Sequence, residues 1–433
     1  MPERNRPFHS YTQAVDYLYS RLPFFQDQGA RAYKPDLGNI RVLLAALGDP
    51  HIGIPYVHIG GTNGKGSSSH ILASILWASG YVTGLFTSPH LKTFTERIRI
   101  NGIPIAQDQV IHFVNETYDT IERIRPSFFE VTTAMAFGHF QKEKVDIAVI
   151  EVGLGGRLDS TNVITPLVSL ITNIGHDHLD LLGPTLTDVA REKAGIIKSG
   201  VPVVISERQS DLENVFRQTA MACNAPIVFA SDHFKVTAAP AHGEWTVASA
   251  EGNMMISTEL KGQYQKKNIC GVLQVISILR EKGYKITDEA LKIGFSKSAS
   301  STGLKGRWQV IRQSPKVVCD TGHNREGILE ILEQLKSEQF KTLRWIFGVV
   351  GDKAPEPILS LLPKHAVYYF CAAHNPRAMD AQQLTQHALS FGLIGTAIGD
   401  VNEALQLALK ESEKDDLILI GGSTYLVAEV DGL

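Results

Sequence analysis

Cysteine is scarce in this sequence. The chain has four cysteines among 433 residues, Cys223, Cys270, Cys319 and Cys371, and no two of them are spaced as C-x-x-C. This argues against a zinc ribbon or a redox dithiol. Cysteines so widely separated in a long chain are typical of reduced thiols in a cytosolic protein, so we expect a cytoplasmic location.

Long apolar runs are also lacking. No stretch reaches about 18 apolar residues, the length that a membrane-spanning helix needs. The first residues, MPERNRPFHSYTQ, contain no apolar segment typical of a signal peptide. We therefore expect no membrane span and no membrane partner.

An excess of positive charge is missing as well. Lysine and arginine number 42 against 45 aspartates and glutamates, which gives a formal net charge of −3. A nucleic-acid-binding protein would usually be strongly basic, so we expect no nucleic-acid partner. The composition, with 43% hydrophobic and 20% charged residues, is that of an ordinary globular protein. Its length predicts two or three domains at about 150 residues each.

Short apolar runs alternate with helical patterns in the first part of the chain. This alternation predicts an α/β domain with a mostly parallel sheet and helices on both faces. The expected strands are 55–60, 145–152, 168–174 and 201–206. The expected helices are 67–80, 185–194 with Thr185 as N-cap, and 268–283 with Asn268 as N-cap. Four short alternating runs within 227–260 predict an antiparallel patch at the edge of this domain.

A segment rich in serine and glycine, 297–306, predicts a linker between two domains. We expect an ATP-binding domain at 1–296 and a smaller Rossmann-like α/β domain at 307–433. The strands expected in the smaller domain are 316–320, 343–350, 366–372 and 416–422.

The strongest local motif is GGTNGKGS at 60–67, between a predicted strand and a predicted helix. Glycines there let backbone N–H groups approach phosphates, Lys65 would reach the terminal phosphates, and the helix N-terminus favours anions. The match to G-x-x-x-x-G-K-[ST] is imperfect, because Ile59 replaces the first glycine and Gly66 follows the lysine. We interpret the motif as a phosphate-binding loop rather than a surface turn.

Further candidates lie at the ends of other predicted strands, where open α/β sheets bind ligands. Glu151 ends an apolar strand and could bind Mg²⁺, or it could be an exposed strand-end carboxylate. His178 could be a ligand of the same ion or a histidine that caps a turn. Lys193 could be an active-site lysine or a helix-end cation that the helix dipole favours.

The smaller domain has candidates of its own. Arg307 could clamp a phosphate and Asp320 could hold a ribose or a base. The alternative is an ordinary strand-to-helix turn, with His323 or Asn324 as the cap.

Together, these segments resemble the folylpolyglutamate synthase/dihydrofolate synthase family, a branch of the Mur-type ATP-dependent ligases. The order and spacing of the motifs carry the resemblance over nearly the whole chain. They are GGTNGKGS (60–67), LFTSPHLKTFTERI (85–98), FFEVTTAMAF (128–137), EVGLGGRLDSTN (151–162), HDHLDLLG (176–183), EKAGIIK (192–198), GQYQKKN (262–268), GRWQ (306–309), DTGHN (320–324), NPRAMDA (375–381) and GGSTYLVAEV (421–430).

The resemblance implies a reaction. ATP phosphorylates the carboxylate of a pteroate or folate, the amine of L-glutamate attacks the acyl phosphate, and phosphate leaves. It also implies that Mg²⁺ is needed, that the organic substrate is dihydropteroate or a reduced folate, and that the protein is a monomer. Phosphoryl transfer of this kind depends on positioning and on charge neutralisation.

The resemblance also implies roles for individual residues. Those implied to bind ATP are Thr62, Asn63, Gly64, Lys65, Gly66, Ser67, Asn268, Arg307, Asp320 and His323. Those implied to bind Mg²⁺ are Ser67, Ser88, Glu151 and His178. Lys193 matches the lysine that CO₂ carbamylates in the family, and Lys65, Lys193 and His178 are implied to act in catalysis. Those implied to lie at the pteroate or folate are Phe128, Phe129, Glu130, Leu158, Asp159 and Ser160. The NPRAMDA segment is implied to lie where glutamate enters.

Two departures and three alternatives remain. Arg325 stands where the family usually has proline after the DTGHN segment, and His176 stands where an apolar residue is common.

The alternatives are a P-loop kinase, another Mur-type ligase that acts on cell-wall precursors or cyanophycin, and a nucleotide-gated binding protein without chemistry. A cell-wall ligase would need a further N-terminal domain, for which a phosphate loop at residue 60 leaves no room. A kinase would not need the second domain, and the retained Lys65 and Glu151 argue against a protein without chemistry.

Overall fold

The computed structural model describes residues 7–23, 36–238, 243–351 and 354–433. These residues form two compact units. The first unit comprises the described parts of Met1–Ile174, His178–Glu259 and Lys266–Gly303, and the second comprises Gly175–Asp177, Leu260–Gln265 and Leu304–Leu433. Each unit has its own sheet and its own core.

The first unit is built on an eight-stranded sheet in the order β4-β3-β2-β5-β1-β6-β7-β8. Its strands are β1 (Tyr56–Gly60), β2 (Thr83–Phe86), β3 (Ile98–Ile100), β4 (Ile103–Pro104), β5 (Ile147–Glu151), β6 (Val168–Ile171), β7 (Val203–Ile205) and β8 (Ile227–Phe229). The pairs from β2 to β8 are parallel, and β3 and β4 add antiparallel edge strands. The mostly parallel sheet predicted from the sequence is therefore confirmed.

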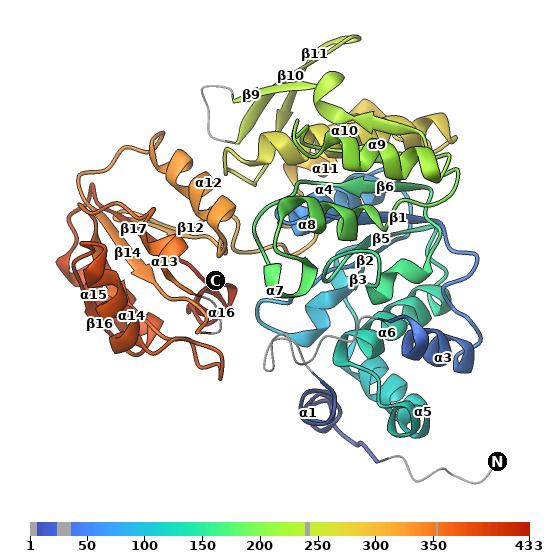
Figure 1. Ribbon diagram of the computed structural model, residues 1–433, viewed down its shortest axis with the longest axis horizontal. Helices are drawn as coiled ribbons and strands as arrows, with labels where there is room; N and C mark the ends of the chain where they lie inside the picture. Colours follow the sequence, from blue (N-terminus) through green and yellow to red (C-terminus); the bar gives the residue numbers. More distant parts are fainter. Residues whose placement is uncertain (1–6, 24–35, 239–242, 352–353) are drawn as a thin grey trace. The chain divides into compact units, whose positions relative to one another are not determined.

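Helices cover both faces of this sheet because its central strands β1 and β5 are mostly apolar and are buried along their whole length. The helices are α1 (Tyr11–Arg21), α3 (Gly38–Ala46), α4 (Lys65–Ala78), α5 (Gln107–Ile124), α6 (Phe128–Lys142), α7 (Leu179–Leu182), α8 (Leu186–Ala194), α9 (Glu213–Ala222), α10 (Gln265–Glu281) and α11 (Asp288–Ser296). Figure 1 shows α10 and α11 above the central strands and α3 and α6 below them. The predicted cap of α8 is present, because the Thr185 hydroxyl accepts a hydrogen bond from the Asp188 N–H group.

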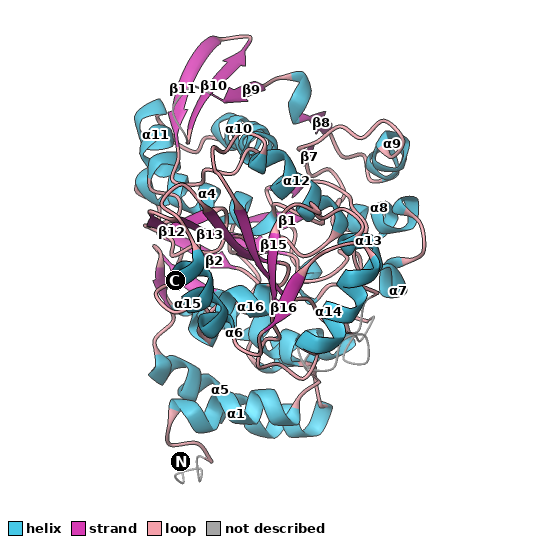
Figure 2. Cartoon of the chain, turned by 90° about the vertical axis from the view of Figure 1, so that its left-hand side faces the viewer, coloured by secondary structure: helices cyan, strands magenta, loops and turns pink. Residues whose placement is uncertain are grey.

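Two local predictions were wrong. The run at 227–229 does not join the antiparallel patch, because β8 pairs in parallel with β7. The other three runs do form an antiparallel sheet, β9 (Lys235–Ala238), β10 (Glu244–Ser249) and β11 (Gly252–Ser257), which is separate from the main sheet (Figure 2). Helix α10 begins at Gln265, so Asn268 lies inside the helix instead of capping it. The residues between them, glutamine and two lysines, are good helix formers and extend the helix.

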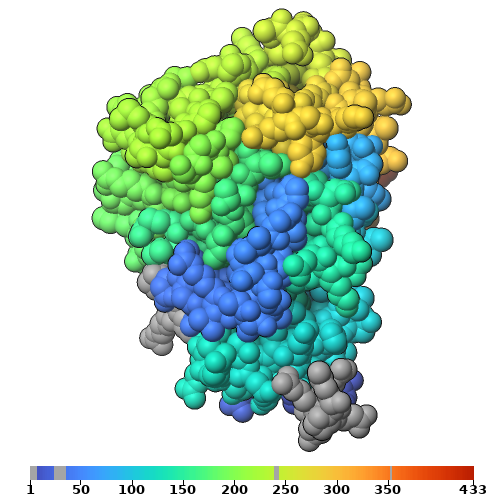
Figure 3. Space-filling view, turned by 90° about the vertical axis from the view of Figure 1, so that its right-hand side faces the viewer, coloured from blue at the N-terminus to red at the C-terminus, as the bar shows by residue number. Residues whose placement is uncertain are grey.

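Residues 297–303 are packed within the first unit. The side chains of Ser298 and Thr302 are buried, and the Thr302 hydroxyl lies 2.8 Å from Nδ1 of His70 on α4. The Glu259 carboxylate accepts hydrogen bonds from the backbone N–H groups of Ala299 and Ser300, which follow Ser298. Small side chains allow this close packing. The preceding helix α11 lies along α4, and Figure 3 shows this part of the surface.

The second unit contains a six-stranded sheet in the order β12-β13-β17-β14-β15-β16. Its strands are β12 (Gln309–Gln313), β13 (Lys316–Cys319), β14 (Leu343–Phe347), β15 (Val367–Phe370), β16 (Gly395–Ala397) and β17 (Leu417–Gly421). Its helices are α12 (Arg325–Leu335), α13 (Glu356–Leu359), α14 (Ala381–Ser390), α15 (Val401–Glu411) and α16 (Thr424–Ala428). Figure 2 shows α12, α13 and α14 along one side of the strands. The four predicted strands are present, whereas the edge strands β12 and β16 were not predicted.

None of the helices in the described part of the chain is long and apolar enough to span a membrane.

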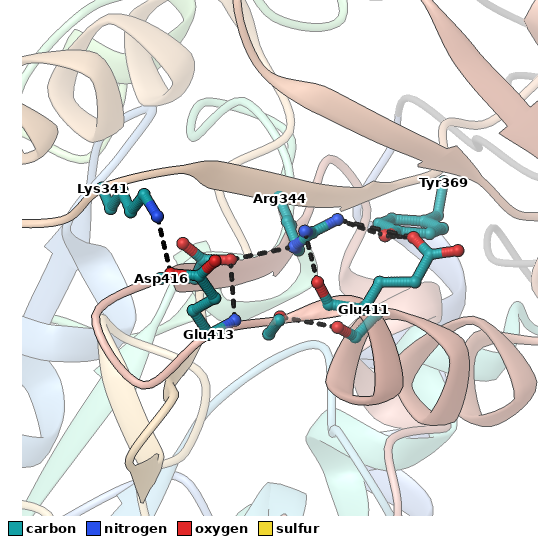
Figure 4. A network of polar contacts seen from close by, with 8 residues as sticks. Lys341, Arg344, Tyr369, Glu411, Glu413 and Asp416 are labelled. Atoms are coloured by element: carbon teal, nitrogen blue, oxygen red, sulfur yellow. Dashed lines mark hydrogen bonds and ion pairs between the residues drawn. The ribbon is translucent and has the colours of Figure 1, made fainter.

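A polar network joins β14, β15 and the residue before β17 in the second unit (Figure 4). Arg344 on β14 donates from Nε to Asp416 Oδ2 at 3.2 Å, from one terminal nitrogen to the Tyr369 hydroxyl at 3.0 Å, and from the other to the Glu411 carbonyl at 2.6 Å. Burial alone would raise the pKa of Asp416, but the Glu413 N–H group and the guanidinium outweigh it and lower that pKa. The network therefore contains a charge pair that is largely removed from water.

We predict that Arg344→Met destabilises the protein, because it leaves the Asp416 carboxylate, which is 2% exposed, without its cation. The free energy of unfolding should fall by about 3 kcal/mol in urea denaturation. Lys341→Met is the matched control and should cost far less, because its partner Glu413 and Lys341 itself are 69% and 61% exposed. The effect of Arg344→Met should shrink as the pH falls from the ordinary aspartate pKa of about 4 through the lower pKa of Asp416 in the folded protein, where this carboxylate loses its charge. Equal losses in the two variants would contradict this account.

Candidate active site

Four loops meet at one edge of the first unit's sheet. They follow β2, β5, β1 and β6, which are adjacent and parallel, so their carboxyl ends point the same way. Glu151, the last residue of β5, lies beside Ile59 of β1, and Gly60 lies beside Ile171 of β6. The sheet therefore places Glu151, the phosphate loop and the segment that contains His178 at one edge, as the strand-end argument predicts.

The loop at 61–64 is held from the end of β6. The Asn173 carbonyl accepts a hydrogen bond from the Thr62 N–H group at 2.8 Å, and its side-chain oxygen accepts one from the Asn63 N–H group at 2.9 Å. The Thr172 hydroxyl donates to the Asn63 carbonyl at 2.6 Å. No role was predicted for Thr172 or Asn173 from the sequence. Their polar side chains directly after an apolar strand are the signal that could have indicated a role.

Helix α4 begins directly behind the loop. Gly64 is its N-cap and has a left-handed backbone, and Lys65 is the first helical residue. A helix start with free N–H groups is a binding site for anions. The next two positions implied to contact ATP, Gly66 and Ser67, lie in the first turn, and Ser67 is buried.

Two ammonium groups reach this loop. Lys65 donates from Nζ to the Thr62 carbonyl at 3.0 Å, and Lys193, at the end of α8, donates from Nζ to the Gly61 carbonyl at 2.9 Å. Lys193 is 5% exposed, whereas a lysine that only complements a helix dipole would extend into water. Its burial beside the loop supports the active-site interpretation.

Asn268 lies against the same loop. It is buried on α10, and a Cβ atom added to Gly64 would lie 2.2 Å from its side-chain oxygen. Packing of α10 against the loop thus brings Asn268 beside Gly64, and both residues are implied to bind ATP.

Ser88 and Glu151, two of the implied Mg²⁺ ligands, lie together. Glu151 is 4% exposed, and its Oε2 atom accepts a hydrogen bond from the Ser88 N–H group at 3.1 Å. His178 is in the left-handed region immediately before α7. His176, the unusual histidine, belongs to the second unit, where its Nδ1 atom lies 2.7 Å from Glu326 Oε1.

The segment that carries Ser88 is fastened at its far end. The Glu96 carboxylate accepts hydrogen bonds from three backbone N–H groups, those of residues 91, 92 and 93. Arg97 donates from Nε to Nδ1 of His90 at 2.7 Å. Burial and the Arg97 cation lower the pKa of His90 to about 2, so this imidazole stays neutral and accepts the bond. The sequence analysis gave Glu96 and Arg97 no role.

Two of the residues implied to bind the pteroate or folate, Phe129 and Asp159, meet at Gly153. Phe128, Phe129 and Glu130 form the first turn of α6, where Ser127 and Glu130 make a capping box. A Cβ atom on Gly153 would lie 2.5 Å from the Phe129 ring, so this ring rests on the loop after β5. The Asp159 carboxylate accepts hydrogen bonds from the Gly153 and Leu154 N–H groups at 3.0 and 2.9 Å.

Asp159 is therefore committed to the protein's own backbone. Burial raises the pKa of its carboxyl, and the hydrogen bonds from Thr161, Leu154 and Gly153 oppose that rise. Its neighbours Leu158 and Ser160 are half-buried and buried. The Asp159 carboxylate thus shapes the loop after β5 through its hydrogen bonds to backbone N–H groups.

The three residues implied to bind ATP from the second unit lie around one strand-to-helix turn. The buried Asp320 carboxylate accepts hydrogen bonds at 2.8 Å from the Trp308 and Gly322 N–H groups and from the Tyr264 hydroxyl. Arg307 donates to the Thr321 hydroxyl, and Asn324 caps α12. The exposed His323 lies with Nδ1 2.9 Å from the Thr321 carbonyl. Burial raises the pKa of Asp320.

The NPRAMDA segment is fastened through the residue before it. The Glu429 carboxylate accepts a hydrogen bond from the His374 N–H group at 2.6 Å and lies 2.9 Å from Nδ1 of its ring. This partner raises the pKa of His374. The loop that contains Arg377 is thereby attached to the end of α16.

Two domain families match the chain. The Mur ligase middle domain matches residues 59–276, and the Mur ligase glutamate ligase domain matches residues 306–424. Dihydrofolate synthase/folylpolyglutamate synthase of Bacillus subtilis is 34% identical, with 98% of this chain and 99% of the relative covered. Folylpolyglutamate synthase of Lacticaseibacillus casei is 33% identical, with 97% and 98% covered.

The chain belongs to the folylpolyglutamate synthase/dihydrofolate synthase family of Mur ligases. It is therefore an ATP-dependent ligase. Among solved structures, E. coli FolC in complex with DHPP and ADP superimposes with a TM-score of 0.84 at 27% identity and covers 98% of this chain and 97% of its own. A folylpolyglutamate synthase–AMPPCP–folate complex superimposes with a TM-score of 0.81 at 31% identity, with 97% and 98% covered. The resemblance stated from the motifs is confirmed.

We predict that Gly64→Ala impairs the site, with Gly80→Ala as a matched control. The two glycines flank α4 with φ of 87° and 90°, so an alanine adds similar backbone strain of about 1–2 kcal/mol at either one. A Cβ atom at Gly80 meets nothing within 4 Å, whereas one at Gly64 displaces Asn268. Binding of an ATP analogue, measured by calorimetry, should weaken in Gly64→Ala and stay near the parent value in Gly80→Ala. Unchanged binding in both would show that Asn268 and Gly64 do not shape the nucleotide site.

Proposed function

We propose that the protein joins L-glutamate to the carboxylate of dihydropteroate or a reduced folate. The carboxylate oxygen attacks the γ-phosphorus of ATP, which forms an acyl phosphate and releases ADP. The glutamate amine then attacks the acyl carbon, loses its proton, and displaces phosphate to leave an amide. The observation that carries this proposal is the phosphate loop with Lys65 and Lys193 directed at it, beside Glu151 and the loop that Phe129 covers.

Lys65 supplies positive charge where negative charge develops. In phosphoryl transfer the protein contributes positioning and electrostatic stabilisation more than covalent chemistry. Lys65 donates from Nζ to the Thr62 carbonyl of the loop, and the phosphates of ATP would offer it better acceptors. The backbone N–H groups at the start of α4 would add to this stabilisation.

The donor set at the strand ends fits Mg²⁺. Magnesium prefers oxygen ligands, and the Glu151 carboxylate with the Ser88 and Ser67 hydroxyls supplies them, with His178 as a further ligand. When bound, the ion would neutralise charge on the phosphates. Two of these residues lie together, because the Ser88 N–H group donates to Glu151 Oε2.

Carbamylation of Lys193 is a finer part of the proposal. The reaction of its amine with CO₂ gives a carbamate and a proton, which turns a cation into an anion that can organise a metal ion.

The remaining assignments rest on the resemblance. Phe128, Phe129 and Glu130 would lie along the pterin. Asn268, Arg307, Asp320 and His323 would contact the nucleotide, and the loop at 375–381 would lie where glutamate enters.

The experiment that tests the function is ADP release by the purified protein with ATP, Mg²⁺ and glutamate. Dihydropteroate and tetrahydrofolate are supplied separately, and the products are identified by mass. Release that requires both glutamate and one of the two substrates, with a product heavier by one glutamyl residue, supports the proposal. Release that needs neither, or a product formed from a cell-wall precursor, contradicts it.

We predict that Lys65→Ala lowers turnover by about 10²–10³, the usual loss when one contact to transition-state charge is removed. The fold should survive, because Lys65 lies at a helix start and is half-buried. Lys142→Ala, at the exposed end of α6, is the control and should keep parental turnover. Near-parental activity of Lys65→Ala would show that the phosphate-loop assignment is wrong.

We predict a different behaviour for Lys193→Ala. If the lysine acts as a carbamate, formate or acetate should restore part of the activity by replacing the missing negative charge. Lys65→Ala should show no such rescue, because the group it lacks is a cation. A crystal structure with bound ATP that shows an unmodified Lys193 ammonium would overturn the carbamate.

A further inference from the structure

We infer that His58 and Thr161 are positioning residues that hold the loop after β5 in register with the phosphate loop. This inference rests on the proposed function. It concerns a buried chain of hydrogen bonds that runs from the central strand β1 through Thr161 to Asp159 and ends on the backbone of Gly153 and Leu154.

The chain begins at a histidine in an apolar strand. His58 is the middle residue of β1, two positions before Gly60, where the phosphate loop starts, and its side chain is fully buried. Burial, and secondarily the nearby Lys198 cation, lower the pKa of His58 to about 3, so the ring is neutral. Its Nε2 atom lies 2.9 Å from the Thr161 hydroxyl oxygen.

The direction of the hydrogen bonds follows from the number of protons. Thr161 has one hydroxyl proton, and it donates that proton to Asp159 Oδ1 at 2.5 Å. Its oxygen must then accept from His58, which therefore carries its proton on Nε2. A valine at 161 would leave the His58 N–H group and one acceptor position of Asp159 without this partner.

Asp159 lies at the other end of this chain of hydrogen bonds. Its Oδ1 atom accepts hydrogen bonds from the Thr161 hydroxyl and N–H group, and its Oδ2 atom accepts from the Gly153 and Leu154 N–H groups. Gly153 follows Glu151 by two residues and lies beneath the Phe129 ring. This chain of hydrogen bonds thus connects β1, which leads into the phosphate loop, with the loop after β5. That loop follows Glu151, an implied Mg²⁺ ligand, and lies against Phe129, which is implied to lie at the folate.

This connection fixes the two halves of the reaction relative to each other. An acyl phosphate forms only when the carboxylate oxygen meets the γ-phosphorus in line, and an error of about 1 Å can cost roughly 100-fold in rate. Release of the loop should therefore impair the step that uses the folate carboxylate. The phosphate loop should be spared, because Thr172 and Asn173 hold it from β6.

The test is Thr161→Val, which keeps the side-chain volume and removes the hydroxyl. We expect kcat to fall by about 10- to 100-fold and KM for dihydropteroate or tetrahydrofolate to rise, while KM for ATP stays near the parent value. The matched control is Thr117→Val, since the buried Thr117 hydroxyl donates only within its own helix, to the Phe113 carbonyl. Thr161→Ser, which keeps the hydroxyl, should recover most of the activity.

A second variant attacks the other end of the chain and guards against a failure of Thr161→Val to fold. His58→Phe keeps the ring and removes the N–H donor, and it should raise KM for the same substrate. The double variant should lose less than the sum of the single losses in free energy, because both break one chain.

Parental kcat and KM in Thr161→Val, or losses equal to those of Thr117→Val, would overturn the inference. A parent protein that makes no glutamylated product would instead contradict the proposed function, so the two failures are distinguishable.

Discussion

The hydrogen bonds that join the phosphate loop to Thr172, which donates, and to Asn173, which accepts, are the interactions on which the rest of the site depends. They attach the loop at 61–64 to the end of β6, so β1 and β6 set its shape together. Because backbone groups of the loop are hydrogen-bonded in this way, the protein itself fixes the shape of the loop. A loop whose shape the protein fixes can stabilise developing charge without reorganisation during the reaction. The lysines, Asn268 and the start of α4 are all placed relative to this loop.

The loops at the carboxyl ends of the parallel strands are also held by hydrogen bonds from several segments of the chain. Glu151 holds Ser88 from β5, Glu96 and Arg97 hold the far end of the same segment, and Asp159 folds the loop after β5 back on itself. Glu151 and Asp159 are buried and Glu96 is half-buried, and each of these carboxylates accepts hydrogen bonds from backbone N–H groups. Carboxylates thus position the backbone of these loops.

The sequence predicted the parts of this arrangement that depend on local patterns. The strand before the phosphate loop, the cap of α8 and Glu151 at a strand end follow from periodicity and spacing, and the motif combination identified the family. Parts that depend on distant partners were not predictable. Whether 227–229 pairs with β7 or with β9 depends on the rest of the sheet. Asn268 was predicted as a helix cap, but α10 begins three residues earlier, and its contact with Gly64 depends on residues about 200 positions away in the sequence. The backbone partners of Asp159 were likewise not predictable from the local pattern.

The central claim is that the folate carboxylate attacks ATP at this loop and passes through an acyl phosphate. The most direct measurement uses dihydropteroate or folate with both oxygens of the reacting carboxylate labelled with ¹⁸O. Attack by the carboxylate places one of its oxygens in the phosphate, and attack by glutamate leaves it there. The account predicts one ¹⁸O atom in each phosphate released and one retained in the amide. Unlabelled phosphate, with glutamylated product formed at the same rate, would contradict it.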